Sequence, residues 1–298
     1  TALGQGSLST ETTGRAAVAV GFNALATLNV GSNLESYNVA VGSEAGAAMT
    51  VGLRNTIIGG LAGDALTDAD DNIAIGQGAL GTDTLGSKSV AVGRAALATQ
   101  NFTTATTSYN VAVGHNAGVA VSTAVQNTLI GGQVGDALTQ GARNTAVGYV
   151  ALSSDTRGQY STAVGYAALF SSNQTTAVNT YNVAVGYNAG GAVTTGLFNT
   201  LVGGLSGDAL TDADYNTGLG YLALSSDTLG STSTAVGAFA LRDQNLTTAT
   251  DVYNTAVGYN AGGDVTVGFM NTLVGGLTGD ALTDADYNVA VGFHALGS

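Results

Sequence analysis

Three aspartates recur at a fixed spacing in a short glycine-flanked segment, and carboxylates placed in this way could perform two kinds of chemistry. The segment reads GGLAGDALTDADDN at residues 59–72, GGLSGDALTDADYN at 203–216 and GGLTGDALTDADYN at 275–288. Loops rich in carboxylate and carbonyl oxygens bind calcium, which takes about six to eight oxygen ligands, and paired carboxylates carry out acid–base catalysis. The candidate calcium ligands are Asp64, Asp68, Asp70, Asp208, Asp212, Asp214, Asp280, Asp284 and Asp286.

A fourth copy of the segment indicates whether these carboxylates are needed. It reads GGQVGDALTQGARN at residues 131–144, keeps Asp136, and has Gln140 and Ala142 where the other copies have aspartate. Because the segment keeps its length without the acidic pair, we interpret the aspartate shared by all four copies as an acceptor for backbone N–H groups at a turn. The shared aspartates are Asp64, Asp136, Asp208 and Asp280. Calcium bound by the three acidic copies is the alternative interpretation.

No other group of residues predicts catalysis. His115 and His294 are the only histidines, and they stand where other repeats carry Tyr, Asn or Ala, which indicates solvated surface. Without cysteine the chain has no disulfide, thiolate metal site or cysteine nucleophile, and no Ser/His/Asp group recurs. A regular repeat also predicts no cleft for a substrate. We therefore predict no catalytic residue, no enzymatic activity and, apart from the calcium alternative, no cofactor.

The composition disfavours several classes of partner. Of 298 residues, 45 are glycine, 9% are charged, and none is proline, cysteine or tryptophan. The formal net charge is −13 with seven basic residues. We therefore predict neither nucleic-acid binding, which needs clustered Lys and Arg, nor attraction to an anionic membrane. No run of about 18 apolar residues predicts membrane insertion, and a cysteine-free chain suits the outside of a cell or virion.

One word, Asn-x-Ala-Val-Gly, recurs along the whole chain and determines the predicted architecture. Its glycines lie 17 or 21 residues apart, in a cycle of three spacings of 17 and one of 21 that repeats every 72 residues. The glycines are Gly4, Gly21, Gly42, Gly59, Gly76, Gly93, Gly114, Gly131, Gly148, Gly165, Gly186, Gly203, Gly220, Gly237, Gly258, Gly275 and Gly292. The 72-residue super-repeats cover residues 38–109, 110–181 and 182–253, with partial copies at 1–37 and 254–298. This cycle predicts a solenoid of about 17 coils.

The residues before each glycine predict a short β-strand in every coil. The residue directly before it is always Val, Ile or Leu, and the residue three positions before it is always Thr, Val or Ile. These two columns lie two residues apart and therefore share one face of a strand, where β-branched side chains are favoured. A coil of this length is too short for a strand–helix unit, which needs about 30 residues. We predict an all-β, parallel β-solenoid (β-roll) that runs as a single domain through residues 1–298.

A column of amides accompanies the strands. Asn or Ser stands four residues before the glycine in every complete coil except at Ala17. Stacking of the coils would place these side chains over one another, so the column predicts an amide ladder at a turn.

The 21-residue coil has a longer corner, which ends in a tyrosine directly before the next Asn. We predict that this tyrosine packs against the corner, with a spaced binding stripe as the alternative. The tyrosines are Tyr37, Tyr109, Tyr181 and Tyr253. The same corner carries Asn-x-Thr sequons, which mark an exposed loop, at Asn101, Asn173 and Asn245.

Neither face of the predicted strand carries charge. One face can fill the interior of the coil, whereas the other would expose an apolar strip larger than the few hundred Å² that are usual for a monomer. A second copy covering this strip predicts a homo-oligomer. Threonine columns on a solenoid also raise ice binding as an alternative. The column three positions before the glycine has ten Thr, interrupted by six Val and one Ile, which is less regular than a flat ice-binding face requires.

The words NTAVGYNAG at residues 254–262 and SVAVGRAALA at residues 89–98 resemble the repeats of YadA-type trimeric autotransporter adhesin heads. They are equally similar to the NTAVGY repeats of bacteriophage tail fibres, and the similarity covers essentially the whole chain. The resemblance implies a left-handed parallel β-roll, three copies of which form a trimer that binds host surfaces. The coils of this chain are longer than those typical of the adhesin heads, so the outer corners are expected to differ.

These observations together predict a structural or adhesive fibre segment that lies outside the cell, on a cell surface or on a virion. It would act as a rigid rod and a surface-binding scaffold, with a trimer as its assembly and a host-surface or matrix receptor as its partner. Because the first and last residues both fall within a coil, we expect a segment of a longer fibre. The alternative is a filament of solenoids stacked head to tail, and the third reading is a calcium- or ice-binding module.

Overall fold

The computed structural model describes residues 1–31 and 34–297, and every regular element in these ranges is a β-strand. The chain forms two compact units, Thr1–Asn144 and Thr145–Ser298. Within each unit, the short strand of one coil pairs in parallel with the strand of the next, and the two units contribute eight and nine such turns. The prediction of an all-β parallel solenoid with about 17 turns is confirmed. A single domain over residues 1–298 stays a prediction.

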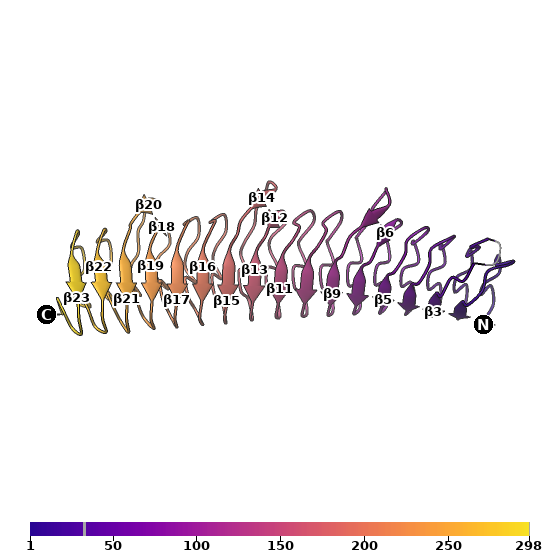
Figure 1. The fold of residues 1–298 in the computed structure, drawn as a ribbon, viewed down its shortest axis with the longest axis horizontal. Helices are drawn as coiled ribbons and strands as arrows, with labels where there is room; N and C mark the ends of the chain where they lie inside the picture. The colour runs from indigo at the N-terminus through magenta and orange to yellow at the C-terminus, as the bar shows by residue number, and fades with distance from the viewer. Residues whose placement is uncertain (32–33, 298) are drawn as a thin grey trace. The chain divides into compact units, whose positions relative to one another are not determined.

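The first unit, drawn in indigo to magenta in Figure 1, stacks eight short strands. They are β1 Ala2–Leu3, β2 Val18–Val20, β3 Val39–Val41, β4 Thr56–Ile58, β5 Ile73–Ile75, β7 Val90–Val92, β9 Val111–Val113 and β10 Thr128–Ile130. The pairing is in register, so that Val39 lies opposite Thr56 and Val90 lies opposite Val111. A second parallel pair, β6 Gly86–Ser87 with β8 Thr106–Thr107, forms in a longer corner.

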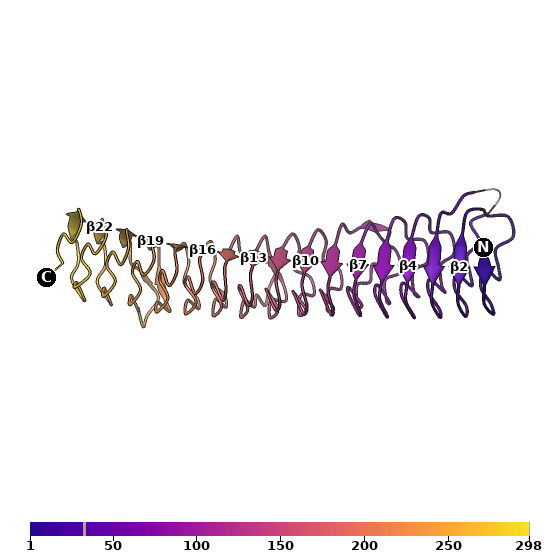
Figure 2. The same ribbon diagram turned by 90° about the horizontal axis from the view of Figure 1, so that it is seen from below.

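The second unit repeats this arrangement with nine strands, and Figure 2 gives a view of them after a quarter turn. They are β11 Thr145–Val147, β13 Thr162–Val164, β15 Val183–Val185, β16 Thr200–Val202, β17 Thr217–Leu219, β19 Thr234–Val236, β21 Thr255–Val257, β22 Thr272–Val274 and β23 Val289–Val291. Two longer corners carry the pairs β12 Gly158–Gln159 with β14 Val178–Asn179, and β18 Gly230–Ser231 with β20 Thr250–Asp251.

The glycine directly after each strand is required because two successive coils approach closely at this position. Gly186 has φ +141°, a conformation that L side chains rarely adopt. A Cβ atom at this position would lie 2.4 Å from the carbonyl oxygen of Gly203 in the next coil. The repeated glycine therefore provides both the backbone conformation and the space that tight stacking needs.

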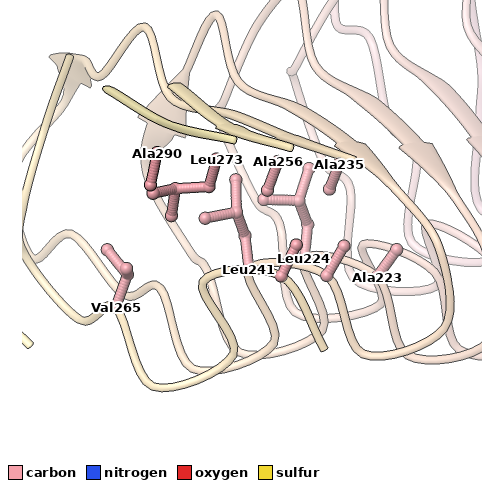
Figure 3. Close-up of a cluster of buried hydrophobic side chains, with 10 residues drawn as sticks. Ala223, Leu224, Ala235, Leu241, Ala256, Val265, Leu273 and Ala290 are labelled. Atoms are coloured by element: carbon pink, nitrogen blue, oxygen red, sulfur yellow. The ribbon is translucent and has the colours of Figure 1, made fainter. Parts of the chain in front are cut away.

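The middle residue of each strand points into the coil. Figure 3 shows Ala235, Ala256, Leu273 and Ala290 on one wall of the second unit, facing Leu241 and its neighbours on the opposite wall. All of these side chains are buried. The interior is so narrow that alanine fills most positions of the strand column. The two β-branched columns, which flank this middle residue, consequently face outward.

Larger strand residues fit because glycines make room for them. Leu201 is fully buried, and a Cβ atom on Gly190 or Gly207 would lie within 3 Å of its methyl groups. The same relationship holds for Leu273 with Gly262 and Gly279. Each large side chain therefore fills the space left by two glycines, which is the close packing expected of protein interiors.

The asparagine column forms a buried ladder, as predicted, but its hydrogen bonds run mainly to the backbone. Asn199 Oδ1 accepts the N–H of Asn216 at 2.9 Å, and Asn199 Nδ2 donates to the carbonyl oxygen of Ala213 at 2.7 Å. The backbone N–H of Asn199 in turn donates to Asn182 Oδ1 at 2.9 Å. Each amide thus provides hydrogen-bond partners for buried backbone groups at the turn. These groups lie outside the strands and have no partner in the strand pairing.

Candidate functional site

The outer face of the strands is an apolar surface that no other part of the same unit covers completely. Its two columns, directly before the glycine and three residues before it, are only partly covered. Ile58 and Ile130 in the first unit and Leu219 in the second expose 38–47% of their surface. Singly exposed apolar side chains are ordinary, but a continuous strip of them indicates a contact surface.

In the second unit, a row of tyrosines follows the motif glycines along the edge of this outer face. Row A consists of Tyr149, Tyr166 and Tyr187, each 51–60% exposed. The ring centroids of Tyr149 and Tyr166 lie 5.9 Å apart, and those of Tyr166 and Tyr187 lie 5.4 Å apart. The parallel register of β13 and β15 fixes the spacing of these side chains.

A second aromatic row directly precedes the buried column of asparagine and serine. Row B consists of Tyr160, Tyr181, Phe198 and Tyr215, and its successive ring centroids lie 5.1, 5.7 and 4.8 Å apart with interplanar angles of 5–21°. All four residues have left-handed backbone, with φ of 49–61°. Because near-parallel rings cover each other's faces, row B presents ring edges and phenolic hydroxyls to solvent.

The corresponding positions of the first unit carry other chemistry. At the row B position, Arg54 Nε binds Asp71 Oδ1 at 2.5 Å, and Lys88 Nζ lies 5.5 Å from the ring centre of Tyr109. At the row A position, Arg94 contacts the His115 ring at 3.3 Å. The same coil therefore forms with charged or aromatic residues at these positions. Since the fold does not require the aromatic rows of the second unit, they are candidates for contact with a partner.

The structure corrects the interpretation of the corner tyrosines as packed residues. Tyr37, Tyr109, Tyr181 and Tyr253 all remain about half exposed. A large side chain buried against the corner would lose most of its accessible surface. Tyr181 instead belongs to row B, where its neighbours are the rings of the adjacent coils. The sequon asparagines Asn101, Asn173 and Asn245 are also exposed, as predicted.

The third aspartate of each acidic copy accepts a backbone hydrogen bond from the preceding coil. Asp70 Oδ1 accepts the N–H of Leu53 at 2.8 Å. The equivalent bonds from Leu197 to Asp214 and from Phe269 to Asp286 measure 2.7 and 3.0 Å. The shared first aspartate was predicted as an acceptor of backbone N–H groups, and Asp64 contacts its own backbone amide and that of Ala65.

The shared aspartates have a different environment. Burial raises the pKa of Asp64, Asp136 and Asp208 above the usual range, while contact with the backbone amide of the same residue opposes the rise. In Asp136, Asp208 and Asp280, Oδ1 is buried without a hydrogen-bond partner among the described atoms. Asp280 Oδ1 also lies 3.7 Å from Nδ1 of His294, whose side chain is half exposed.

The middle aspartates of the segment, Asp68, Asp212 and Asp284, are exposed. Asp212 Oδ1 accepts a hydrogen bond from the Thr195 hydroxyl at 2.6 Å. In the part of the chain that the structure describes, no three His, Cys, Asp or Glu side chains gather closely enough to hold a metal ion. The three aspartates of each copy thus lie in three different local environments, and calcium binding stays an alternative prediction.

Sequence reasoning missed a second set of carboxylates, which is buried in the 17-residue coil that precedes each of three longer corners. Asp227 Oδ1 accepts the N–H groups of Gly230 and Leu246 at 3.0 and 3.2 Å, and Oδ2 accepts Gln244 Nε2 at 2.5 Å. Burial raises the pKa of Asp227, and these hydrogen bonds oppose the rise. The signal in the sequence is an Asp-Thr-x-Gly word, DTLG at 83–86 and 227–230 and DTRG at 155–158.

The coil that precedes the first longer corner carries a glutamate at this position. Its word is ETTG at residues 11–14, and Glu11 Oε1 accepts the N–H of Gly14 at 2.6 Å. Glu11 Oε2 accepts the N–H of Val30 at 3.3 Å. A carboxylate one methylene longer thus reaches equivalent backbone groups, which identifies this position as a structural acceptor next to each longer corner.

No ligand-sized cavity is present in the described residues, and none of their elements is a helix that could span a membrane. Comparison of the chain with protein families, with curated proteins and with solved structures gives no match. The fold therefore defines the class, a parallel β-solenoid repeat protein. The resemblance to adhesin heads and tail fibres stays a prediction.

Proposed function

We propose that this chain is a non-enzymatic segment of an extracellular fibre, either a cell-surface adhesin or a phage tail fibre. It works as a stiff scaffold that presents its outer face to a host surface or matrix receptor. The observation that carries the proposal is the outer face itself, whose fully formed strands expose an apolar strip and, in the second unit, two aromatic rows. Exposed aromatic side chains with a polar end are enriched where proteins contact partners.

The stiffness follows from the hydrogen bonds between coils. Around Gly203, the N–H of this residue donates to the Val185 carbonyl oxygen at 2.8 Å, and the N–H of Leu205 donates to the Tyr187 carbonyl oxygen at 2.8 Å. Comparable bonds recur through both units. Bending between two coils would break several of these bonds together, so each unit should resist bending along its stack of coils.

The proposed coil cycle is three coils of 17 residues and one of 21, in a β-roll that associates as a trimer. The outward columns of Val, Ile, Leu and Thr support this association because burial of about 25 cal/mol per Å² of apolar surface favours covering them. A head-to-tail filament of the same solenoid is the second assembly, which the outer edges of the end strands β1 and β23 would permit, because each of these strands pairs with a neighbour on one side only.

The mass of the protein in solution tests this proposal, measured by light scattering with and without a chelator. One chain has a mass of 29.2 kDa. We expect the mass of a particle of three chains, and we expect this mass to be the same with and without the chelator. A monomer would overturn the trimer, polymers of growing length would favour the filament, and dissociation on chelation would revive the calcium site.

A single substitution on the outer face of a strand tests whether this face is the surface buried in the trimer. Val202 is on the outer face of β16, so Val202→Lys should leave the fold intact and dissociate the trimer. Asn245→Lys, on an exposed longer corner, adds the same charge away from that face and should leave the mass unchanged. Equal behaviour of the two variants would exclude the outer face as the interface.

A further inference from the structure

We propose that the tyrosine pairs of the second unit are sites of oxidative dityrosine cross-linking, which joins successive coils covalently. The pairs are Tyr160 with Tyr181, Tyr149 with Tyr166, and Tyr166 with Tyr187. The modification is a covalent bond between two phenol rings of one chain. It does not depend on the partner or the assembly proposed above.

The first observation is the geometry of the rings. Tyr160 and Tyr181 stack at 5.1 Å between centroids with 21° between the ring planes, and Tyr166 and Tyr187 stack at 5.4 Å with 12°. Rings at this separation bring the carbons beside the phenolic oxygen of one residue close to those of the next. All of these rings except that of Tyr160 are 47–60% exposed, so a soluble oxidant reaches row A and one ring of the row B pair.

The second observation is that the backbone holds the pairs in place. The N–H of Ala167 donates to the Tyr149 carbonyl oxygen at 3.1 Å, and the N–H of Asn188 donates to the Tyr166 carbonyl oxygen at 2.9 Å. Each tyrosine of row A is therefore bonded, at its own peptide, to the coil that carries the next. Because the two rings are held next to each other, two radicals formed on them should couple within the chain faster than either couples with a second molecule.

The third observation is the lack of competing oxidisable groups. The chain has no cysteine or tryptophan and only two methionines. Met49 is fully buried in the first unit, whereas Met270 is exposed in the second. Thiols and indoles, which intercept radicals in most proteins, are thus missing, and phenols are the main sites that remain.

The reaction balances with a peroxide as the oxidant. Each of two phenols loses one electron and one proton, and the two radicals couple through the ring carbons next to oxygen to form a C–C bond. Each coupling carbon then gives up its hydrogen as a proton while the neighbouring oxygen takes up a proton again. The pair loses two hydrogens in all, and one hydrogen peroxide accepts the two electrons and two protons to give two waters.

The cross-link would act on this chain as a disulfide acts on others. It closes a loop of one coil between residues that are already adjacent in the folded state, which restricts mainly the unfolded chain. Unlike a disulfide, the C–C bond is not reversed by thiols. A cysteine-free fibre segment would thereby become more resistant to unfolding once exposed to peroxide.

The test treats the whole chain at low concentration with a haem peroxidase and hydrogen peroxide. Dityrosine fluorescence, and peptides joined with the loss of two hydrogens, report the product. Within one chain we expect Tyr160 to be joined to Tyr181, and Tyr166 to be joined to either Tyr149 or Tyr187, with a yield per chain that does not change on dilution. The cross-linked protein should also unfold at a higher temperature than the untreated protein.

Two double variants make the assignment specific. Tyr166→Phe with Tyr181→Phe keeps every ring but removes one phenol from each pair, and it should lose the intrachain product and the thermal gain. Tyr221→Phe with Tyr253→Phe removes two equally exposed phenols outside the pairs and should behave as the wild type. Wild-type yield in the first variant, or cross-links found only between chains, would overturn the proposal.

Discussion

A Cβ atom on Gly186 would lie 2.4 Å from the carbonyl oxygen of Gly203, so the two coils meet with no room for a side chain. The Gly186 φ of +141° adds a second restriction, because it lies outside the regions open to L residues. The pair explains why a glycine recurs at this position in every coil of the sequence.

Gly186→Ala should therefore lower the free energy of unfolding by about 2–4 kcal/mol, from backbone strain and displacement of the next coil. Urea unfolding followed by circular dichroism measures the change. Gly204→Ala is the matched control, since its Cβ would meet the Tyr221 ring at an ordinary 3.6 Å. A control loss as large as that of Gly186→Ala would refute the close-approach explanation.

Leu201→Ala should destabilise the second unit by about 2–5 kcal/mol, because it removes fully buried methyl groups and leaves a cavity inside the coil. Gly190 and Gly207 line the position and carry no side chains to move. Val202→Ala, one residue along on the outer face, should cost less than about 1 kcal/mol in a monomeric reference state. Thermal unfolding of both variants, compared at one protein concentration, decides between a buried and a surface role for Leu201.

Asn199→Ala should cost about 1–3 kcal/mol, since it leaves the Asn216 N–H and the Ala213 carbonyl oxygen without their side-chain partner. Asn199→Asp keeps the acceptor, loses the donor and places a charge in the interior, so it should be worse at neutral pH than in acid. The two variants are compared by denaturant unfolding at two pH values. No difference with pH for Asn199→Asp would show that the side chain has left the interior.

The pH dependence of stability should carry the signature of Asp227. Burial raises the folded-state pKa of this carboxyl above its unfolded value. The folded state therefore binds the proton of Asp227 more tightly than the unfolded state does. This binding stabilises the protein fully at a pH below the unfolded-state pKa, and the stabilisation is lost as the pH rises through the folded-state pKa. Asp227→Asn cannot titrate, so the difference in unfolding free energy between variant and wild type should shift in favour of the variant over that window.

Unfolding of both proteins at a series of pH values between about 3 and 7 measures this difference. Asp243→Asn provides a control of opposite sign. The guanidinium of Arg242 lowers the pKa of Asp243, so that carboxylate contributes stability that is lost as the pH falls. A wild-type slope that Asp227→Asn does not alter would show that the buried carboxyl does not titrate with folding.

The architecture of this protein could be predicted from its sequence alone. The constant spacing of the motif glycines and the β-branched columns before them specify a short strand in each coil, and a coil so short leaves room only for strands and turns. Equal spacing also requires strands of successive coils to pair in parallel and in register, as Val183 does with Thr200. The asparagine column could be placed at a turn because an amide that recurs at the same position of most coils is expected to stack.

Which face of the strand is buried was decided only by the tertiary structure. Both faces of a segment such as Thr200–Val202 are apolar, so alternation does not distinguish them. The width of the coil determines which face is buried. The opposite wall leaves space for alanine, and it leaves space for leucine only where that wall carries glycine. For the same reason the exposed tyrosine rows and the buried Asp227 could not be read from local sequence. Their environment depends on which coil lies next to them, and contacts between residues about a coil apart exist only once the chain has folded.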